Sequence, residues 1–331
     1  MDEKKIPEII IKKNRMPVIY LDTCIMLDLL KYKDGTYKNE YIQEMGELYD
    51  LLLELIRQRK ILCALGNQMI EMGISSKRRK ARDFLYSFTN ICFFEPYILE
   101  RMELDQGYQA YMDEEEIIEF NFDCIIEKDI GLDSQFKVKV ATIYKKEKLD
   151  KLKQIKQDTV AMLNDVKRQK RVEANLEQQL ELELQADFDV FVYILEHAND
   201  SSESFNLFLD SIITILMRSK CEVNIYNKEC IYAIERHNSF LLSNYHHKLP
   251  YIWIKSVLWA HRMQRSKRIQ RGDNLDTVWA AAYLPFIDYA ITDNDFCDLL
   301  RSTGLAQQYG VHVYSMRTIK DFINELKDAT I

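Results

Sequence analysis

The sequence has little glycine and proline, no paired cysteines and no long hydrophobic run. Its 331 residues include only 9 glycines and 5 prolines, and so few chain-breaking residues favour a mostly helical protein. The seven cysteines are scattered, none forms a C-x-x-C pair, and their number is odd. This usage is typical of a reducing compartment and argues against a zinc knuckle or a disulfide framework.

Segments that would direct the chain to a membrane are also missing. The start, MDEKKIPEIIIKKNR, mixes charges around a short apolar run, which is not the pattern of a signal peptide. The most apolar later stretch, FNLFLDSIITILM, is interrupted by Asp210 and is too short to span a bilayer. We therefore expect a cytoplasmic protein with no membrane partner.

Positive charge is in deficit, since the formal net charge is −7. That balance alone argues against a general nucleic-acid-binding protein. Hydrophobic residues make up 47 % of the chain, which is typical of a globular protein and excludes a disordered one. The length allows a sizeable core and room for two domains.

Short buried runs alternate with helical patterns at both ends of the chain, which is the pattern of a parallel α/β sheet. Strand signals nearly vanish from about 96 to 250, where leucines recur at helical spacing between charged residues. We therefore predict an α/β domain made of residues 15–95 and 255–331, with a mainly helical insertion at 96–254. The predicted strands are 18–21, 61–65, 91–94, 287–292 and 311–315.

Acidic residues fall where the strands of such a sheet would end. Asp22 directly follows the first predicted strand, and Asp293 directly follows the fourth. Glu71 lies in the first turns of the helix after the second strand, and Asp276 in the first turn of the helix before the fourth. Chemistry in an open parallel sheet sits at the carboxyl ends of the strands, so these four side chains are predicted to face one another.

Each acid also has a structural alternative. Asp22 and Asp293 could be helix caps, Asp273 and Asp276 form a D-x-x-D that resembles a capping arrangement, and Glu71 could be a solvated helix residue. Two carboxylates about 4 Å apart repel by about 4 kcal/mol at an effective dielectric near 20. A cluster of four therefore implies a cation, and hard oxygen ligands favour Mg²⁺ or Mn²⁺ over zinc.

Three segments, VIYLDTCIMLDLL, GNQMIEM and NLDTVWAAAYLPFIDYAITDNDF, resemble the PIN-domain nucleases. The resemblance covers about residues 15–95 and 255–320 and implies a PIN-like parallel sheet flanked by helices. It implies catalytic, metal-binding acids at Asp22, Glu71 and Asp276 and in the TDND segment.

The sequence departs from the family pattern at two positions. Cys24 stands where the family often has asparagine, and Asn294 stands where it often has aspartate. The fourth carboxylate then falls to Asp293 or Asp295, and we expect Asp293 because it lies directly at the strand end. Asp273 and Asn294 are secondary candidates. Asn294 is included because an amide oxygen also coordinates a hard cation.

The resemblance implies Mg²⁺- or Mn²⁺-dependent hydrolysis of phosphodiester bonds, usually of RNA. We expect an endoribonuclease acting as a toxin, in phage defence or in RNA processing. RNA is the expected partner ahead of DNA, and an antitoxin or defence-system protein, or a second copy of the chain, remain open as further partners.

Other readings stay open at this stage. The chain could be a nucleic-acid-binding or regulatory protein of the same fold without nuclease activity, or a structure-specific DNA nuclease. A phosphatase with an aspartyl nucleophile is disfavoured, because Cys24 stands where its second acid would be. A P-loop enzyme is disfavoured, because the motif G-x-x-x-x-G-K-[ST] is missing.

Two basic runs stand next to predicted metal ligands. SKRRKAR has its first lysine six residues after Glu71, and HRMQRSKRIQR ends five residues before Asp276. We predict that they form a rim that binds the phosphate backbone without reading bases. The residues predicted to bind nucleic acid are Lys77, Arg78, Arg79, Arg262, Arg265, Lys267, Arg268 and Arg271.

Overall fold

The computed structural model describes residues 6–66, 68, 78–129, 160–167, 175–219, 228–270 and 272–330. The chain divides into two compact units, each made of separate stretches. We call residues 11–99, 121–170 and 265–331 the sheet unit, and residues 1–10, 100–120 and 171–264 the helical unit.

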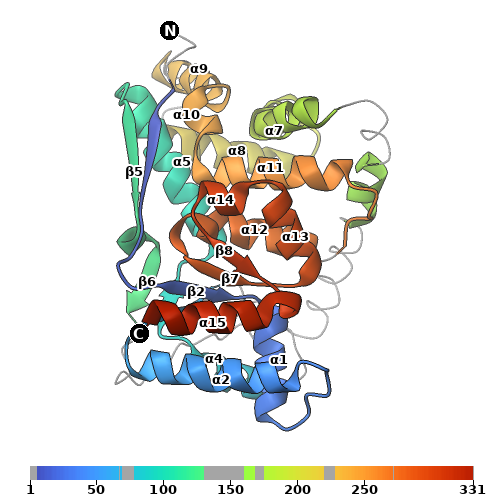
Figure 1. The fold of residues 1–331 in the computed structure, drawn as a ribbon. Helices are drawn as coiled ribbons and strands as arrows, with labels where there is room; N and C mark the ends of the chain where they lie inside the picture. The colour runs from blue at the N-terminus through green and yellow to red at the C-terminus, as the bar shows by residue number, and fades with distance from the viewer. Residues whose placement is uncertain are drawn as a thin grey trace. The chain divides into compact units, whose positions relative to one another are not determined.

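The sheet unit is built on a six-stranded, mostly parallel sheet with the order β6-β4-β3-β2-β7-β8 (Figure 1). All neighbouring strands are parallel except β4 and β6. This confirms the predicted α/β class at its coarse level. The strands are β2 (Val18–Leu21), β3 (Leu62–Leu65), β4 (Ile91–Phe93), β6 (Ile126–Asp129), β7 (Tyr289–Ile291) and β8 (His312–Tyr314).

The strand order reverses at β2. From β2 the chain proceeds outward through β3 and β4, whereas β7 and β8 are added on the other side much later in the sequence. Leu21 of β2 pairs with Ile291 of β7, so the two strands end side by side. Such a switch point leaves a crevice outside the carboxyl ends of the strands, where ligands bind in open α/β sheets.

Helices cover both faces of this sheet, because side chains alternate along each buried strand. On one face Ile19 and Leu21 join a core with α1 (Thr23–Lys33), α2 (Ile42–Arg57), α4 (Arg78–Phe88) and α15 (Ile319–Thr330). On the other face Tyr20 stacks on Trp279 of α12 (Asp273–Tyr283), with ring centroids 4.6 Å apart. Trp279 in turn meets Phe296 of α13 (Asn294–Ser302). The short helix α14 (Leu305–Gln308) leads to β8.

The helical unit holds most of α5 (Pro96–Met112) together with α7 (Leu176–Glu196), α8 (Ser202–Arg218), α9 (Lys228–Leu241), α10 (Asn244–His247) and α11 (Pro250–Gln264). Most of a two-stranded sheet of β1 (Glu8–Lys12) and β5 (Ile117–Asn121) also belongs to this unit. In the part of the chain that the structure describes, no helix combines the length and the apolar character that crossing a membrane requires.

Three strands of the structure are absent from the sequence prediction. β1, β5 and β6 were not predicted, and β5 and β6 lie inside the stretch 96–254 that we expected to be mainly helical. β6 reads IEKD and pairs antiparallel at the edge of the sheet. An edge strand needs no continuous apolar run, so its sequence resembles a solvated loop.

Parts of the predicted insertion belong to the sheet unit. Residues 121–129 and 160–167 belong to the sheet unit. The helix expected after the second predicted strand is seen as α4 from Arg78 onward, and residues 67 and 69–77 lie outside the described residues. The leucine stripe at Leu149, Leu152 and Ile155 lies outside them as well.

Candidate metal centre

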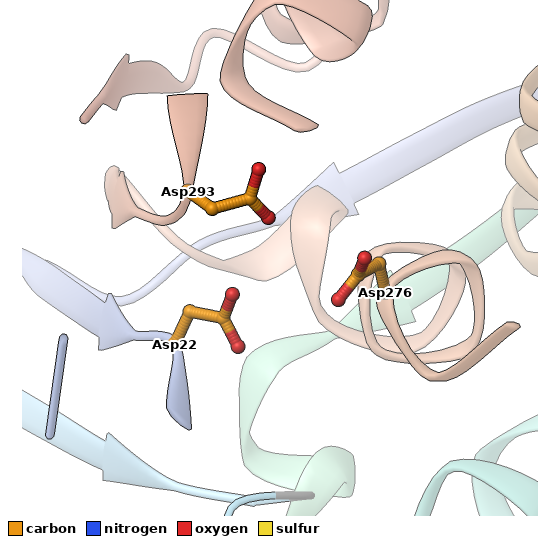
Figure 2. Close-up of side chains that lie close together, drawn as sticks. All are labelled: Asp22, Asp276 and Asp293. Atoms are coloured by element: carbon orange, nitrogen blue, oxygen red, sulfur yellow. The ribbon is translucent and has the colours of Figure 1, made fainter. Parts of the chain in front are cut away.

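Three aspartates from separate parts of the sheet unit converge at the switch point. Asp22 follows β2, Asp293 follows β7 by two residues, and Asp276 lies in the first turn of α12. One carboxylate oxygen of each lies within 4.8 Å of the other two. Figure 2 shows the three carboxylates turned toward one shared space. The structure thus brings together three of the four acids predicted to be catalytic.

The carboxylate of Asp22 is held on both of its oxygens. Oδ1 accepts a hydrogen bond from Thr23 N (2.6 Å), and Oδ2 accepts one from Thr292 Oγ1 (2.7 Å). The backbone N–H of Asp22 donates to Ile291 O (2.9 Å), which ties the end of β2 to the end of β7. Asp22 is only 5 % exposed, so its orientation is fixed by buried contacts.

Asp293 caps a helix and also belongs to the cluster of three carboxylates. It is the N-cap of α13, and its Oδ1 accepts from Asp295 N (2.8 Å) and Phe296 N (3.1 Å). The cap uses one oxygen of the carboxylate, so the other can serve the cluster. Capping therefore orients this side chain and does not exclude metal binding.

Asp276 and Asp273 differ in their surroundings although both lie in the first turn of α12. Asp276 is half-buried and joins the cluster. Asp273 Oδ2 accepts a hydrogen bond from Gln270 N (2.7 Å), in the loop before α12. The N-cap of α12 is Gly272, without a side-chain cap, so the D-x-x-D pair does not form the capping arrangement considered for it. The positive end of the α12 dipole favours negative charge at both positions.

The cluster lies in a cavity of about 340 Å³. Asp273 and Asp295 line it in addition to the three clustered acids, so five carboxylates face this space. Lys267 is the one cationic residue among the described lining residues. The lining consists of Asp22, Thr23, Cys24, Leu27, Lys267, Gln270, Gly272, Asp273, Asp276, Asp293, Asp295 and Phe296.

Asp295, the alternative fourth ligand, is engaged elsewhere. Its Oδ2 lies 2.9 Å from Lys267 Nζ, and its Oδ1 lies 3.9 Å from Arg265 Nη1. It is not part of the group of acids whose oxygens lie within 4.8 Å of one another. The neighbouring Asn294 has a buried Oδ1 without a hydrogen-bond partner among the described residues. The geometry therefore favours Asp293 over Asp295 as a metal ligand.

Cys24 lines the same cavity, with its Sγ 3.7 Å from Asp22 Oδ2. Solvent reaches this side chain, yet the cavity walls desolvate the thiolate. That desolvation, followed by the charges of Asp22, Asp293 and Asp276, raises the pKa of the thiol well above its usual value. Cys24 is therefore a neutral donor toward Asp22 at neutral pH, and not a fourth negative charge.

Two supporting residues were missed at the sequence level. Thr292 was recognised only as the end of a strand, although its hydroxyl binds Asp22. Gln68 is fully buried, donates to Leu21 O (2.7 Å) and accepts from Gly66 N (2.7 Å), so it joins the end of β3 to the residue before Asp22. A Cβ on Gly66 would stand 2.7 Å from the ring of Tyr283, which explains glycine there.

The structure describes only some of the residues predicted to form a basic rim. Arg265 and Lys267 lie beside Asp295, and Arg268 is exposed. Arg262 is a correction, because it belongs to α11 of the helical unit and is only 5 % exposed; a buried guanidinium does not form a solvent-facing rim. Arg78 and Arg79 open α4, and their side chains are not described. Glu71, Lys77 and Arg271 lie outside the described residues.

Comparison with known proteins found no match among family models, curated proteins or solved structures. The case for a function therefore rests on the geometry of the site.

The donor set fits a hard divalent cation. Three carboxylates held this close repel one another, and a cation between them removes that repulsion. Mg²⁺ and Mn²⁺ take oxygen ligands, and Mg²⁺ in particular is usually bound through one or two carboxylates while it keeps several waters. Asp22, Asp276 and Asp293 are the residues that would hold it.

Proposed function

We propose that this protein is a metal-dependent nuclease with a PIN-like sheet, and that it hydrolyses phosphodiester bonds in single-stranded RNA. The observation that carries the proposal is the convergence of Asp22, Asp276 and Asp293 in one cavity at the switch point of the sheet. A bound Mg²⁺ or Mn²⁺ would supply a water of lowered pKa and neutralise charge on the phosphate.

The chain's own residues prepare the site for such a substrate. Thr23 N and Thr292 Oγ1 aim the Asp22 carboxylate, and the α13 N-terminus aims that of Asp293. Fixed ligands lose little freedom when they bind, which is the advantage of a preorganised site. Lys267 adds one positive charge at the edge of the carboxylate cluster.

The size of the cavity matches a phosphodiester group with its neighbouring sugar. About 340 Å³ is at the lower end of the roughly 300–1,000 Å³ typical of small-ligand pockets. A single strand can bring its backbone into such a space without distortion of a duplex, and a single strand is therefore the substrate that we propose. RNA is preferred to DNA on the strength of the family resemblance, and a cytoplasmic role as toxin, defence protein or RNA-processing enzyme goes with this proposal.

The test is a cleavage assay with labelled single-stranded RNA and DNA of one sequence, in Mn²⁺, Mg²⁺ or a chelator. We expect metal-dependent cleavage of RNA that falls by at least about a hundredfold, or about 2.7 kcal/mol of transition-state stabilisation, in Asp22→Asn. Asp298→Asn is the matched control, because Asp298 lies on α13 in an exposed pair with Arg317 at 3.7 Å.

Three results would redirect the proposal. Cleavage of DNA alone would indicate a DNA nuclease. RNA binding without cleavage in any metal would indicate a binding or regulatory protein. Equal cleavage by wild type and by folded Asp22→Asn would refute the assignment of the site.

A further inference from the structure

The loop between α11 and α12 places a lysine in the acidic cavity. Lys267 lines this space together with five aspartates, so the lining carries far more negative than positive charge. A single divalent cation leaves that balance negative. A phosphodiester that enters the cavity therefore needs a further positive group, and Lys267 is the cation already there.

The backbone of this loop is held by a segment distant in the sequence. Lys167 Nζ donates to Lys267 O over 2.7 Å. Asn164 donates to Ile269 O (3.0 Å) and accepts from Ile269 N (2.9 Å). Ile269 is buried, so the loop is anchored on both sides of Arg268. The position from which the lysine side chain extends is thus fixed before any ligand binds.

Among the described residues, in contrast, the ammonium group of Lys267 is held only by an exposed ion pair. Its partner is Asp295, at 2.9 Å, and the two side chains are 45 % and 42 % exposed. Ion pairs this accessible contribute little to stability, because solvent screens the two charges. A phosphate offers charge-assisted hydrogen bonds of at least the same strength, so exchange of Asp295 for a phosphate costs little.

We propose that Lys267 is the residue that contacts the substrate phosphate, and that Asp295 is its counter-ion in the substrate-free site and not a metal ligand. The inference rests on the proposed function, because it assumes a metal held by Asp22, Asp276 and Asp293. Asp295 keeps the ammonium group beside the cluster and out of it. Without Asp295, Lys267 would pair with the clustered carboxylates and compete with the metal.

The first test is a double-mutant cycle in the full-length protein with Mn²⁺ affinity as the readout. Asp295→Asn should weaken Mn²⁺ binding about fivefold, the factor that corresponds to about 1 kcal/mol. In a Lys267→Met background the same change should cost less than about twofold, because no ammonium remains to compete. Equal losses in both backgrounds would make Asp295 a ligand and overturn the inference.

The second test measures binding of a 12-nucleotide single-stranded RNA in the Asp22→Asn background, where cleavage is disabled. Lys267→Gln should weaken binding about fivefold and lower the salt slope by about 0.7, the value for one lost contact to a single strand. Lys320→Gln is the control, because Lys320 is exposed on α15 and does not line the cavity. Equal behaviour of the two variants would overturn the role of Lys267.

Different results would overturn the proposed function and the inference about Lys267 and Asp295. A wild-type protein that binds neither Mn²⁺ nor the RNA overturns the proposed function together with this inference. A wild-type protein that binds both, with no coupling between Asp295 and Lys267, overturns this inference alone.

Discussion

At the scale of single residues, two of the carboxylates that we propose as metal ligands also cap helices. Asp22 accepts from Thr23 N at the start of α1, and Asp293 accepts from two N–H groups at the start of α13. A sequence pattern alone presents capping and ligation as competing explanations for each acid. In the structure the hydrogen bonds that cap the helices also fix the direction of each carboxylate, so one role supports the other.

Thr292 is the residue through which this fixation is best tested. Thr292→Val removes the hydroxyl that donates to Asp22 Oδ2, and both side chains are buried. We expect a loss of about 1.5–3 kcal/mol in the free energy of unfolding and weaker Mn²⁺ affinity, measured by urea denaturation and metal titration. Thr292→Ser keeps the hydroxyl and should resemble wild type. A valine variant with unchanged stability and affinity would show that the contact does not matter.

At the scale of elements, the sequence predicted the parts whose signal is local. The central strands are short runs buried on both faces, such as the fully buried β2, and these are recognisable from hydrophobicity. Asp22 and Asp293 could be predicted because each follows such a strand, and Asp276 because it lies in the first turn of the helix before one. Strands β1, β5 and β6 could not, because all three lie at an edge of their sheet and mix apolar with charged residues.

The residues that support the site were missed for a different reason. Gln68, Asn164 and Thr292 act through contacts with residues 47, 105 and 270 positions away. Nothing in their immediate sequence indicates those partners, since each pairing exists only once the strands and loops are in place. Local sequence patterns therefore predict the acids, whereas only the tertiary structure identifies the groups that orient them.

The prediction at this scale concerns the buried contact between α5 and α11. Glu103 is 5 % exposed and accepts from Tyr251 N over 2.9 Å. Burial raises the pKa of this carboxyl from 4.5 to about 8, against the lowering effect of the Tyr251 N–H and with a smaller raising effect of Glu100. The folded protein therefore keeps a proton that the unfolded chain loses above pH 4.5.

It follows that Glu103 lowers the free energy of unfolding as the pH rises from about 4.5 to about 8. Glu103→Gln keeps an acceptor for Tyr251 N but removes the titration. The variant should become more stable than wild type by an amount that grows across this range, on the order of a few kcal/mol at its upper end. Urea denaturation from pH 4 to 9 measures this, and parallel curves for the two proteins would contradict it.

At the scale of the whole molecule, the proposed function requires a chain with a net charge of −7 to bind a polyanion, which calls for a local concentration of positive charge. Arg265, Lys267 and Arg268 supply such charge in one loop of the sheet unit. The acids of the cluster belong to the same unit, although they come from separate stretches of the chain. Affinity for nucleic acid is therefore expected to depend on this loop and not on the overall charge.

This expectation can be measured as a salt dependence. In the Asp22→Asn background, Arg265→Ala combined with Arg268→Ala should lower RNA affinity similarly for different sequences. It should also flatten the slope of log affinity against log salt by about 0.7 per lost contact. Lys38→Ala combined with Lys320→Ala removes the same charge at exposed positions outside the cavity and should leave the slope near wild type. An unchanged slope in the arginine variant would assign these side chains to an ordinary solvated surface.

The central claim is that Asp22, Asp276 and Asp293 share one divalent cation. Its most direct test is a crystal soaked in Mn²⁺, with an anomalous difference map that locates the metal without reference to any assay. The account predicts a peak between the three carboxylates, at about 2.0–2.2 Å from an oxygen of each, and its loss in Asp22→Asn crystals. A map with Mn²⁺ bound elsewhere and no peak between these aspartates would contradict it.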